Sequence, residues 1–351
     1  MKRILTTAAA LAAAASGAHA GGVERSSQSV AILFEEGRYT ELSFGSFSPD
    51  VSGTAFGASS GDMAPSFTSY SLGYKMDVGD RMDFALVIDQ PIGANVDYPA
   101  GTFYRLAEST AKLTSTAITA LLRYQFGGNV SAIGGLRYET VKGVVALPGY
   151  TLSTNNDSEL GYVVGIAWEK PEIAARVALT YNSSITHSLE ALELGTLETT
   201  FDTEVPQSVN LEFQTGIAKD TLLFGSIRWV DWSVFDISPP IYTSPPGSLP
   251  LVAYPKDRVT YNLGIGRRFN ETWSGAVLVG YEPSDGELSG NLGPTDGYKS
   301  IGLAATYSLA NMKITGGVRY VDIGDTTTNI LGGNFTGNSG VGLGVKVGYT
   351  F

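Results

Sequence analysis

The segment Thr116–Phe126, with the sequence TAITALLRYQF, decides the fold. Ile118, Leu122 and Tyr124 stand at alternate positions, and most positions between them hold small or polar residues. A period of two residues is typical of a β-strand with one apolar and one polar face. The length of the segment also suits a tilted strand that crosses a bilayer, which needs about 9–11 residues.

The same alternation recurs along the chain, while stretches with helical periodicity are scarce. It is found in Leu160–Trp168, Ile173–Tyr181, Val209–Phe213, Val259–Ile265 and Val341–Phe351. The composition agrees, since glycine is abundant at 43 residues and a mean hydropathy of +0.06 is too low for a helical membrane protein. We therefore predict an all-β protein.

The connections between these strands alternate in length. Short connections occur at 77–80, 127–129, 169–172, 219–220, 269–272 and 309–311, and long ones at 49–65, 90–112, 143–158, 183–205, 236–257, 283–297 and 323–338. Short turns at one rim and long loops at the other are typical of outer-membrane barrels. We predict a transmembrane antiparallel up-and-down barrel of about 14 strands. A soluble sandwich or propeller is disfavoured because no blade-length repeat is visible and the chain ends on an amphipathic strand.

The N-terminus divides into two short segments before the barrel. Residues 1–20 combine Lys2 and Arg3, an apolar stretch and the triplet Ala18-His19-Ala20, which predicts a signal peptide for export. Residues 21–38 are predicted to form short amphipathic helical turns that plug the lumen as a hatch, and residues 39–351 form the barrel. The apolar hatch residues are Val23, Val30, Ile32, Leu33 and Phe34. The alternative for this segment is a flexible periplasmic tail.

Three stretches resemble the FadL/TodX family of outer-membrane transporters for long-chain fatty acids and other hydrophobic compounds. They are Asp80–Leu86 with Pro91-Ile92-Gly93 and Tyr98, Val205–Ser208 with Ser226–Phe235, and Asp296-Gly297-Tyr298 with Ile301–Leu303. The resemblance implies a fourteen-stranded barrel with an N-terminal hatch, ligand capture from the lipopolysaccharide layer, and release through the barrel wall into the bilayer. The chain departs from the family in lacking its Asn-Pro-Ala motif and in having a shorter hatch.

Two sets of residues are candidates for ligand contact. Apolar residues in the long loop 90–112 are expected to form an outer groove, namely Ile92, Tyr98, Phe103, Tyr104 and Leu106; the alternative is that they pack the loop against its neighbours. Alternation places four basic residues in the lumen, where they could hold a carboxylate: Arg123, Arg137, Arg176 and Lys346. The alternative is that they pair with inward acids such as Glu139, Glu159 or Glu212.

Three other features of the sequence are expected to have structural roles. Trp229, Trp232 and Phe235 are expected to be girdle or rim anchors rather than ligand contacts. The proline-rich stretch 239–246 is expected to be a stiff, polyproline-like lid or spacer. The glycine pairs at 134–135 and 316–317 are positions where a strand could kink.

We expect a monomeric passive channel that takes up hydrophobic small molecules into an apolar lumen pocket in a Gram-negative outer membrane. The alternative is a general diffusion porin, for which a charged fraction of 16% is low. Expected partners are the hydrophobic ligand, outer-membrane lipid and lipopolysaccharide, and the barrel assembly machinery through Phe351. A net charge of −11 argues against nucleic acid. The absence of cysteine and the single His187 after the signal peptide predict no metal, no cofactor and no enzymatic activity.

Overall fold

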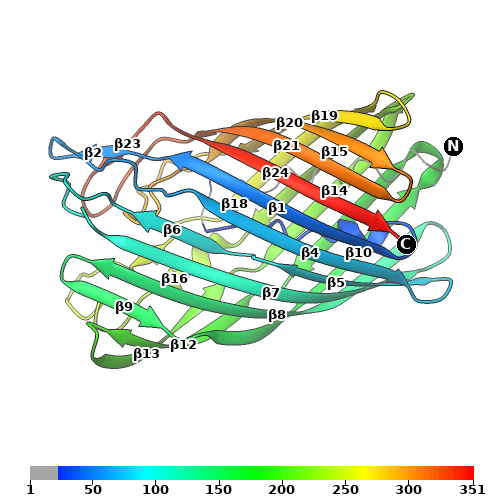
Figure 1. Ribbon diagram of the computed structural model, residues 1–351. Coiled ribbons are helices and arrows are strands. Elements are labelled where there is room, and N and C mark those ends of the chain that lie inside the picture. The colour runs from blue at the N-terminus through cyan, green and yellow to red at the C-terminus, as the bar shows by residue number, and fades with distance from the viewer. Residues whose placement is uncertain (1–22) are drawn as a thin grey trace.

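The computed structural model describes residues 23–351, so the predicted signal peptide and the first two residues of the predicted hatch lie outside the described part. The chain forms a closed antiparallel barrel of 14 strands (Figure 1). The first strand, β1 (Tyr39–Asp50), pairs with the last, β24 (Asn338–Thr350), and this ladder closes the barrel. The predicted all-β fold and the predicted strand number are confirmed.

Between these two strands, the wall follows the order of the chain, as in an up-and-down barrel. The other barrel strands are β4 (Phe67–Asp77), β5 (Met82–Asp89), β7 (Thr110–Gln125), β8 (Val130–Leu147), β10 (Asp157–Lys170), β11 (Ala175–Asn182), β14 (Ser208–Ala218), β15 (Thr221–Val230), β18 (Arg258–Arg268), β19 (Trp273–Glu282), β20 (Tyr298–Leu309) and β21 (Met312–Ile323).

Short turns lie at the end of the barrel that holds the C-terminus, and the long loops lie at the opposite end (Figure 1). Several expected loops contain strands of their own. Four of these strands extend the main sheet, namely β6 (Gly93–Asp97), β9 (Tyr150–Thr154), β12 (Ile185–Glu193) and β13 (Leu197–Val205). Four others form a small separate sheet in the order β22 (Thr326–Thr327), β23 (Asn334–Phe335), β2 (Gly53–Ala55) and β3 (Ala58–Ser59). The last two, β16 (Asp236–Ile237) and β17 (Val252–Ala253), pair with each other.

The clearest departure from the expected loops is the hairpin of β12 and β13, at residues 183–205. Alternate residues of β12 from Ile185 to Glu193 are buried and those between them are exposed. This is the strand period again, but polar residues such as His187 and Glu193 occupy buried positions, so the hydrophobic alternation that marks the other strands is weak here.

The outer surface of the barrel is apolar. Phe44, Leu136, Leu160 and Ile166 are each more than half exposed because they point outward from their strands. Aromatic residues gather at the short-turn end, and they are Phe126, Trp168, Phe269, Trp273 and Phe351. Such a surface fits the lipid-facing band and aromatic girdle of a transmembrane barrel. Among residues 23–351, no helix is long and apolar enough to span a bilayer.

Helical structure is limited to three short 3₁₀ turns, η1 (Ala31–Phe34), η2 (Pro171–Ile173) and η3 (Trp232–Val234), in the described part of the chain. The η1 turn is the only regular helical piece of residues 23–38, where the sequence predicted one or two helical turns. Gly37 has a φ of +63°, a backbone conformation that glycine adopts freely, and β1 begins two residues later.

Candidate functional site

The N-terminal segment, residues 23–38, lies inside the barrel. Val30, Ile32 and Leu33 are buried against inward-facing residues of the wall, which include Ala85, Leu121, Ile133 and Val163. The wall leaves room for this contact at Gly73 of β4, because a Cβ atom there would lie 2.4 Å from the Cδ1 of Ile32. The described residues of the segment are therefore packed against the wall.

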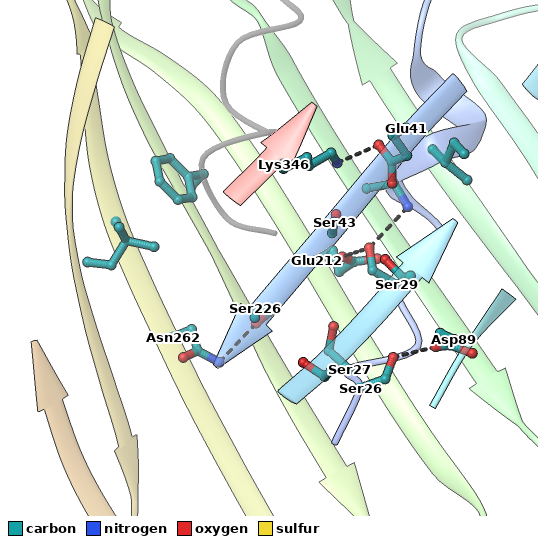
Figure 2. A pocket seen from close by; sticks show the side chains of 18 of the residues that line it. Ser26, Ser27, Ser29, Glu41, Ser43, Asp89, Glu212, Ser226, Asn262 and Lys346 are labelled. Carbon is teal, nitrogen blue, oxygen red and sulfur yellow. Dashed lines mark hydrogen bonds and ion pairs between the residues drawn. The ribbon is translucent and has the colours of Figure 1, made fainter. Parts of the chain in front are cut away.

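Polar contacts fix the same segment from the opposite side of the lumen. The Ser29 hydroxyl donates to the Glu212 carboxylate, and the Asn210 amide donates to the carbonyl oxygen of Ser27 at 2.9 Å. The Arg228 guanidinium forms an ion pair with Glu24, with both side chains buried. Figure 2 shows the Ser29–Glu212 contact at the edge of the cavity that these residues line.

One seam of the wall is interrupted next to this segment. The ladder between β4 and β5 ends at the pair Leu72 and Ile88, and β6, which continues β5 after residues 90–92, pairs only with β7 in the described structure. The two sides meet again at Met63, whose carbonyl oxygen accepts from the Asp97 amide at 2.9 Å. Within residues 23–351, no ladder pair joins 64–71 to 89–96.

The N-terminal segment takes the place of the missing partner. Glu24 forms an antiparallel bridge with Ile92, and the bridge is flanked by hydrogen bonds from the Gly93 amide to the Val23 carbonyl at 2.7 Å and from the Arg25 amide to the Pro91 carbonyl at 2.8 Å. Residues 90–92, which interrupt β5, therefore pair with the N-terminal segment, residues 23–38 (called the plug from here on), instead of with β4.

Side chains complete this closure. The Arg25 guanidinium lies over the ring of Phe67 in β4 and donates from Nε to the Gly93 carbonyl at 2.8 Å. Ser26 donates to the Asp89 carboxylate at the end of β5 (Figure 2).

The glycine pairs at 134–135 and 316–317, where a kink was expected, instead lie in continuous ladders of β8 and β21.

The four basic candidates all lie on the inner face of the wall, and three of them have polar partners. Arg123 forms ion pairs with Asp83 and Glu169, and Lys346 forms one with Glu41. The partners are thus acids other than the three that the sequence analysis suggested.

Arg137 and Arg176 differ from that pattern. Arg137 donates to the hydroxyl of Thr119 at 3.2 Å and to the side-chain oxygen of Asn182 at 3.0 Å. Arg176 lines the lumen cavity and has its guanidinium 4.4 Å from the ring centre of Phe34. Among the described residues, Arg176 has no ion pair within 4 Å, but the carboxylates of Glu212, Glu169 and Glu35 act on its charge.

The five outer-loop candidates do not form one groove. Tyr98 and Tyr104 stack with their ring centres 5.4 Å apart in a buried cluster, and Leu106 packs against that cluster. Ile92 belongs to a different buried cluster, and Phe103 is 98% exposed. The packing alternative therefore describes Tyr98, Tyr104 and Leu106, and a capture role for the set stays a prediction.

Two expected girdle residues are in fact interior. Trp232 and Phe235 are buried, with ring centres 5.5 Å apart, in the cluster that contains Val23 and Ile92. The expectation of rim anchors was wrong for these two because the chain turns inward through η3 directly after β15. They support the beginning of the plug.

A cavity of about 220 Å³ separates the plug from the wall formed by β1, β4 and β24. An apolar pocket was expected, but the lining is mixed. The apolar side chains include Ile32, Val87, Phe224 and Leu278, and the polar ones include Ser43, Ser69, Ser71, Glu35, Glu41, Arg176 and Lys346. Figure 2 shows polar side chains from β1, β24 and the plug around the same space. The pocket is less apolar than expected because Ser43 and Glu41 of β1 and Ser69 and Ser71 of β4 occupy inward positions.

At the long-loop end, Glu193 anchors the proline-rich loop. Its carboxylate accepts from Tyr150 at 2.8 Å, from Thr199 at 2.7 Å, and from the backbone amides of Ile241 and Tyr242, both at 3.1 Å. Burial opposes the charge, but the hydrogen bonds outweigh it, so the pKa of Glu193 lies below its usual range. The loop folds into hydrogen-bonded turns, not the extended polyproline form that was expected.

His187 is fully buried in β12, and its Nδ1 lies 2.9 Å from the Asp157 carboxylate. The His187 Nε2 has no hydrogen-bond partner in residues 23–351, so no serine there contacts it as a nucleophile would. The same residues hold no group of three or more His, Asp or Glu side chains that could bind a metal.

The chain was compared with known proteins by sequence and by structure. No family model matches it, and no curated protein does. Its structure is similar to a FadL homologue of Pseudomonas aeruginosa, with a TM-score of 0.74 and 13% identity over 96% of both chains. It is also similar to the toluene transporter TodX of Pseudomonas putida, with a TM-score of 0.68 and 12% identity over 97% of this chain and 98% of that one.

A third similar structure is the toluene transporter TbuX of Ralstonia pickettii, with a TM-score of 0.64 and 13% identity over 91% of this chain and 90% of that one. All three likenesses extend over nearly the whole barrel. The chain therefore has the fold of the FadL and TodX outer-membrane channels, and the resemblance read from its sequence is confirmed at the level of the fold.

Proposed function

We propose that this protein is an outer-membrane channel for the passive uptake of small hydrophobic or amphipathic molecules, such as long-chain fatty acids or hydrocarbons. A molecule enters from the long-loop end, occupies the lumen cavity, and leaves sideways into the bilayer through the seam between β4 and β5/β6. The plug, residues 23–38, must withdraw from that seam to let it pass. Export through the periplasm and assembly through Phe351 are part of this proposal.

The interrupted seam carries the proposal. A barrel in lipid closes its ladders because unpaired backbone groups in hydrocarbon cost several kcal/mol each. Here residues 90–92 are paired with the plug instead, through Val23, Glu24 and Arg25. A wall opening that a movable segment covers is useful only to a molecule that partitions into the bilayer.

Two further observations favour this function over a general diffusion porin. The plug crosses the lumen and is held there by buried contacts such as Glu24–Arg228, whereas a porin keeps a wide aqueous path. The fold neighbours are a FadL homologue and two proteins described as toluene transporters.

The test is single-channel conductance in a planar bilayer, combined with uptake of a radiolabelled long-chain fatty acid or toluene by expressing cells. We expect the intact protein to be nearly silent to ions yet active in uptake, and a variant lacking residues 21–38 to conduct. Folding of both proteins is checked by resistance of the barrel to denaturation in detergent. A large steady conductance of the intact protein, with no uptake of either probe, would establish the porin instead.

A further inference from the structure

Three serines, Ser43, Ser69 and Ser71, line one side of the lumen cavity and are called the serine wall below. Ser43 on β1 pairs with Ser71 on β4 and with Lys346 on β24, so these three inward positions are adjacent on neighbouring strands. Ser69 lies two residues before Ser71 in β4, so both side chains are on the same face of the strand. Ser43 and Lys346 are among the polar side chains around the cavity in Figure 2.

These hydroxyls have no partners of their own. Within the described residues, the side chains of Ser43, Ser69 and Ser71 form no hydrogen bond to protein atoms, although all three line the cavity. The Glu35 side chain also reaches the cavity, is only 7% exposed, and has no hydrogen bond or ion pair in residues 23–351. The three serines are only half-buried, so solvent reaches their hydroxyls, and an occupant that displaces this solvent must donate and accept hydrogen bonds in its place.

The charges of the cavity do not favour an anion. The lining contains the basic residues Arg25, Arg176, Arg319 and Lys346, and the acidic residues Glu35, Glu41, Asp89 and Glu212. Lys346, which is next to Ser43, is already paired with Glu41. Basic and acidic side chains are therefore balanced, and a carboxylate placed on the serine wall would meet Glu41 as well as Lys346.

The remainder of the lining supplies an apolar surface. Ile32 of the plug, Val87 of β5, Phe224 of β15 and Leu278 of β19 face the same cavity. An alcohol hydroxyl matches serine because both donate and accept, and an alkyl chain matches the apolar side chains. We propose that the cavity binds an amphiphile with an uncharged head group that carries several hydroxyls, with the head group on Ser43, Ser69 and Ser71. This proposal rests on the proposed channel function and names its substrate class.

The test uses three probes with the same dodecyl-length chain: 1-monolauroylglycerol, lauric acid and dodecane. Equilibrium binding of each probe is measured to the folded protein held in an amphipathic polymer, which avoids detergents that have hydroxylated heads. We expect monolauroylglycerol to bind at least tenfold more tightly than the other two. The Ser43→Ala/Ser71→Ala variant should lose at least fivefold of that affinity, while its binding of dodecane stays unchanged.

Ser46→Ala is the matched control, because Ser46 lies on β1 at a position that faces away from the cavity. It should bind all three probes as the unaltered protein does. Equal binding of all three probes, tightest binding of lauric acid, or an unchanged affinity in the double variant would overturn the head-group assignment and leave the channel function standing. Failure of every probe to bind would overturn both.

Discussion

Two seams of the same barrel wall are closed in different ways. The β7–β8 seam is paired along the whole of β7, from Thr110 to Gln125. The β4–β5 seam is paired only between Leu72–Asp77 and Asp83–Ile88, and beyond that point a segment from outside the barrel sequence takes over. A continuous ladder opens only by breaking many backbone hydrogen bonds together, whereas under the proposed mechanism the second seam would open when residues 23–38 undock. The proposed exit therefore lies where the ladder is interrupted, between β4 and β6.

The largest effect should come from locking the plug to the seam. Glu24 and Ile92 form a non-hydrogen-bonded antiparallel pair, since the bonds from Gly93 and Arg25 flank them. The Cα atoms of such a pair are about 4.5 Å apart, within the range of a disulfide. We expect Glu24→Cys/Ile92→Cys to lose uptake of the hydrophobic probe when oxidised and to regain it on reduction. The chain has no cysteine of its own, so the engineered pair provides the only thiols.

The single variant Ile92→Cys is the control for this lock. It should transport equally well under oxidising and reducing conditions, which separates the effect of the cross-link from that of the lost isoleucine. If the oxidised double variant, with its disulfide verified by mass, transported at the normal rate, the plug would not cover the exit and the two seams would be functionally alike.

A smaller effect is expected from loosening the plug. Arg228→Gln removes the buried partner of Glu24, and an unpaired buried charge costs about 3–5 kcal/mol. We expect faster amide hydrogen exchange in residues 23–34, and brief ion-conducting events that the intact protein lacks. The control is Arg267→Gln, an exposed position on β18. Unchanged protection of residues 23–34 would show that the apolar contacts of Ile32 and Leu33 suffice to hold the plug.

The wall could be predicted because every strand repeats the same physical rule. Alternation in stretches such as Thr116–Phe126 and the alternating connection lengths fixed the strand number and the direction of the barrel. The β12–β13 hairpin was missed because its buried positions include His187 and Glu193, which hide the apolar alternation. A strand that lies outside the lipid-facing band and buries polar side chains has no alternation of apolar residues in its sequence.

The site was harder to predict because it depends on contacts between segments far apart in the chain. Ile32 and Leu33 led to the prediction that residues 21–38 lie in the lumen, but the contacts of this segment to Asp89, Glu212 and Arg228 span 63, 183 and 204 residues of sequence. The charged pair Glu24-Arg25, at the start of the segment, was a signal that the prediction did not use. Pro91 was a second such signal, because proline cannot donate to a ladder and is excluded from central strands.

The smallest effect on transport should come from the far end of the molecule. Glu193 accepts four hydrogen bonds, two of them from the amides of Ile241 and Tyr242 in the loop 239–251, and it takes no part in either seam. Its pKa is lowered by those bonds, so their contribution is complete above the ordinary glutamate pKa of about 4.3 and is lost as the pH falls through the lowered value. We expect Glu193→Gln to speed hydrogen exchange in residues 239–251 at neutral pH, as acid does in the unaltered protein, because an amide nitrogen cannot accept the bonds that a carboxylate oxygen accepts. The exposed Glu198→Gln is the control and should leave the loop unchanged. Uptake should stay within about twofold of normal; a loss as large as that of the locked plug would mean that the loop, and not the seam, limits passage.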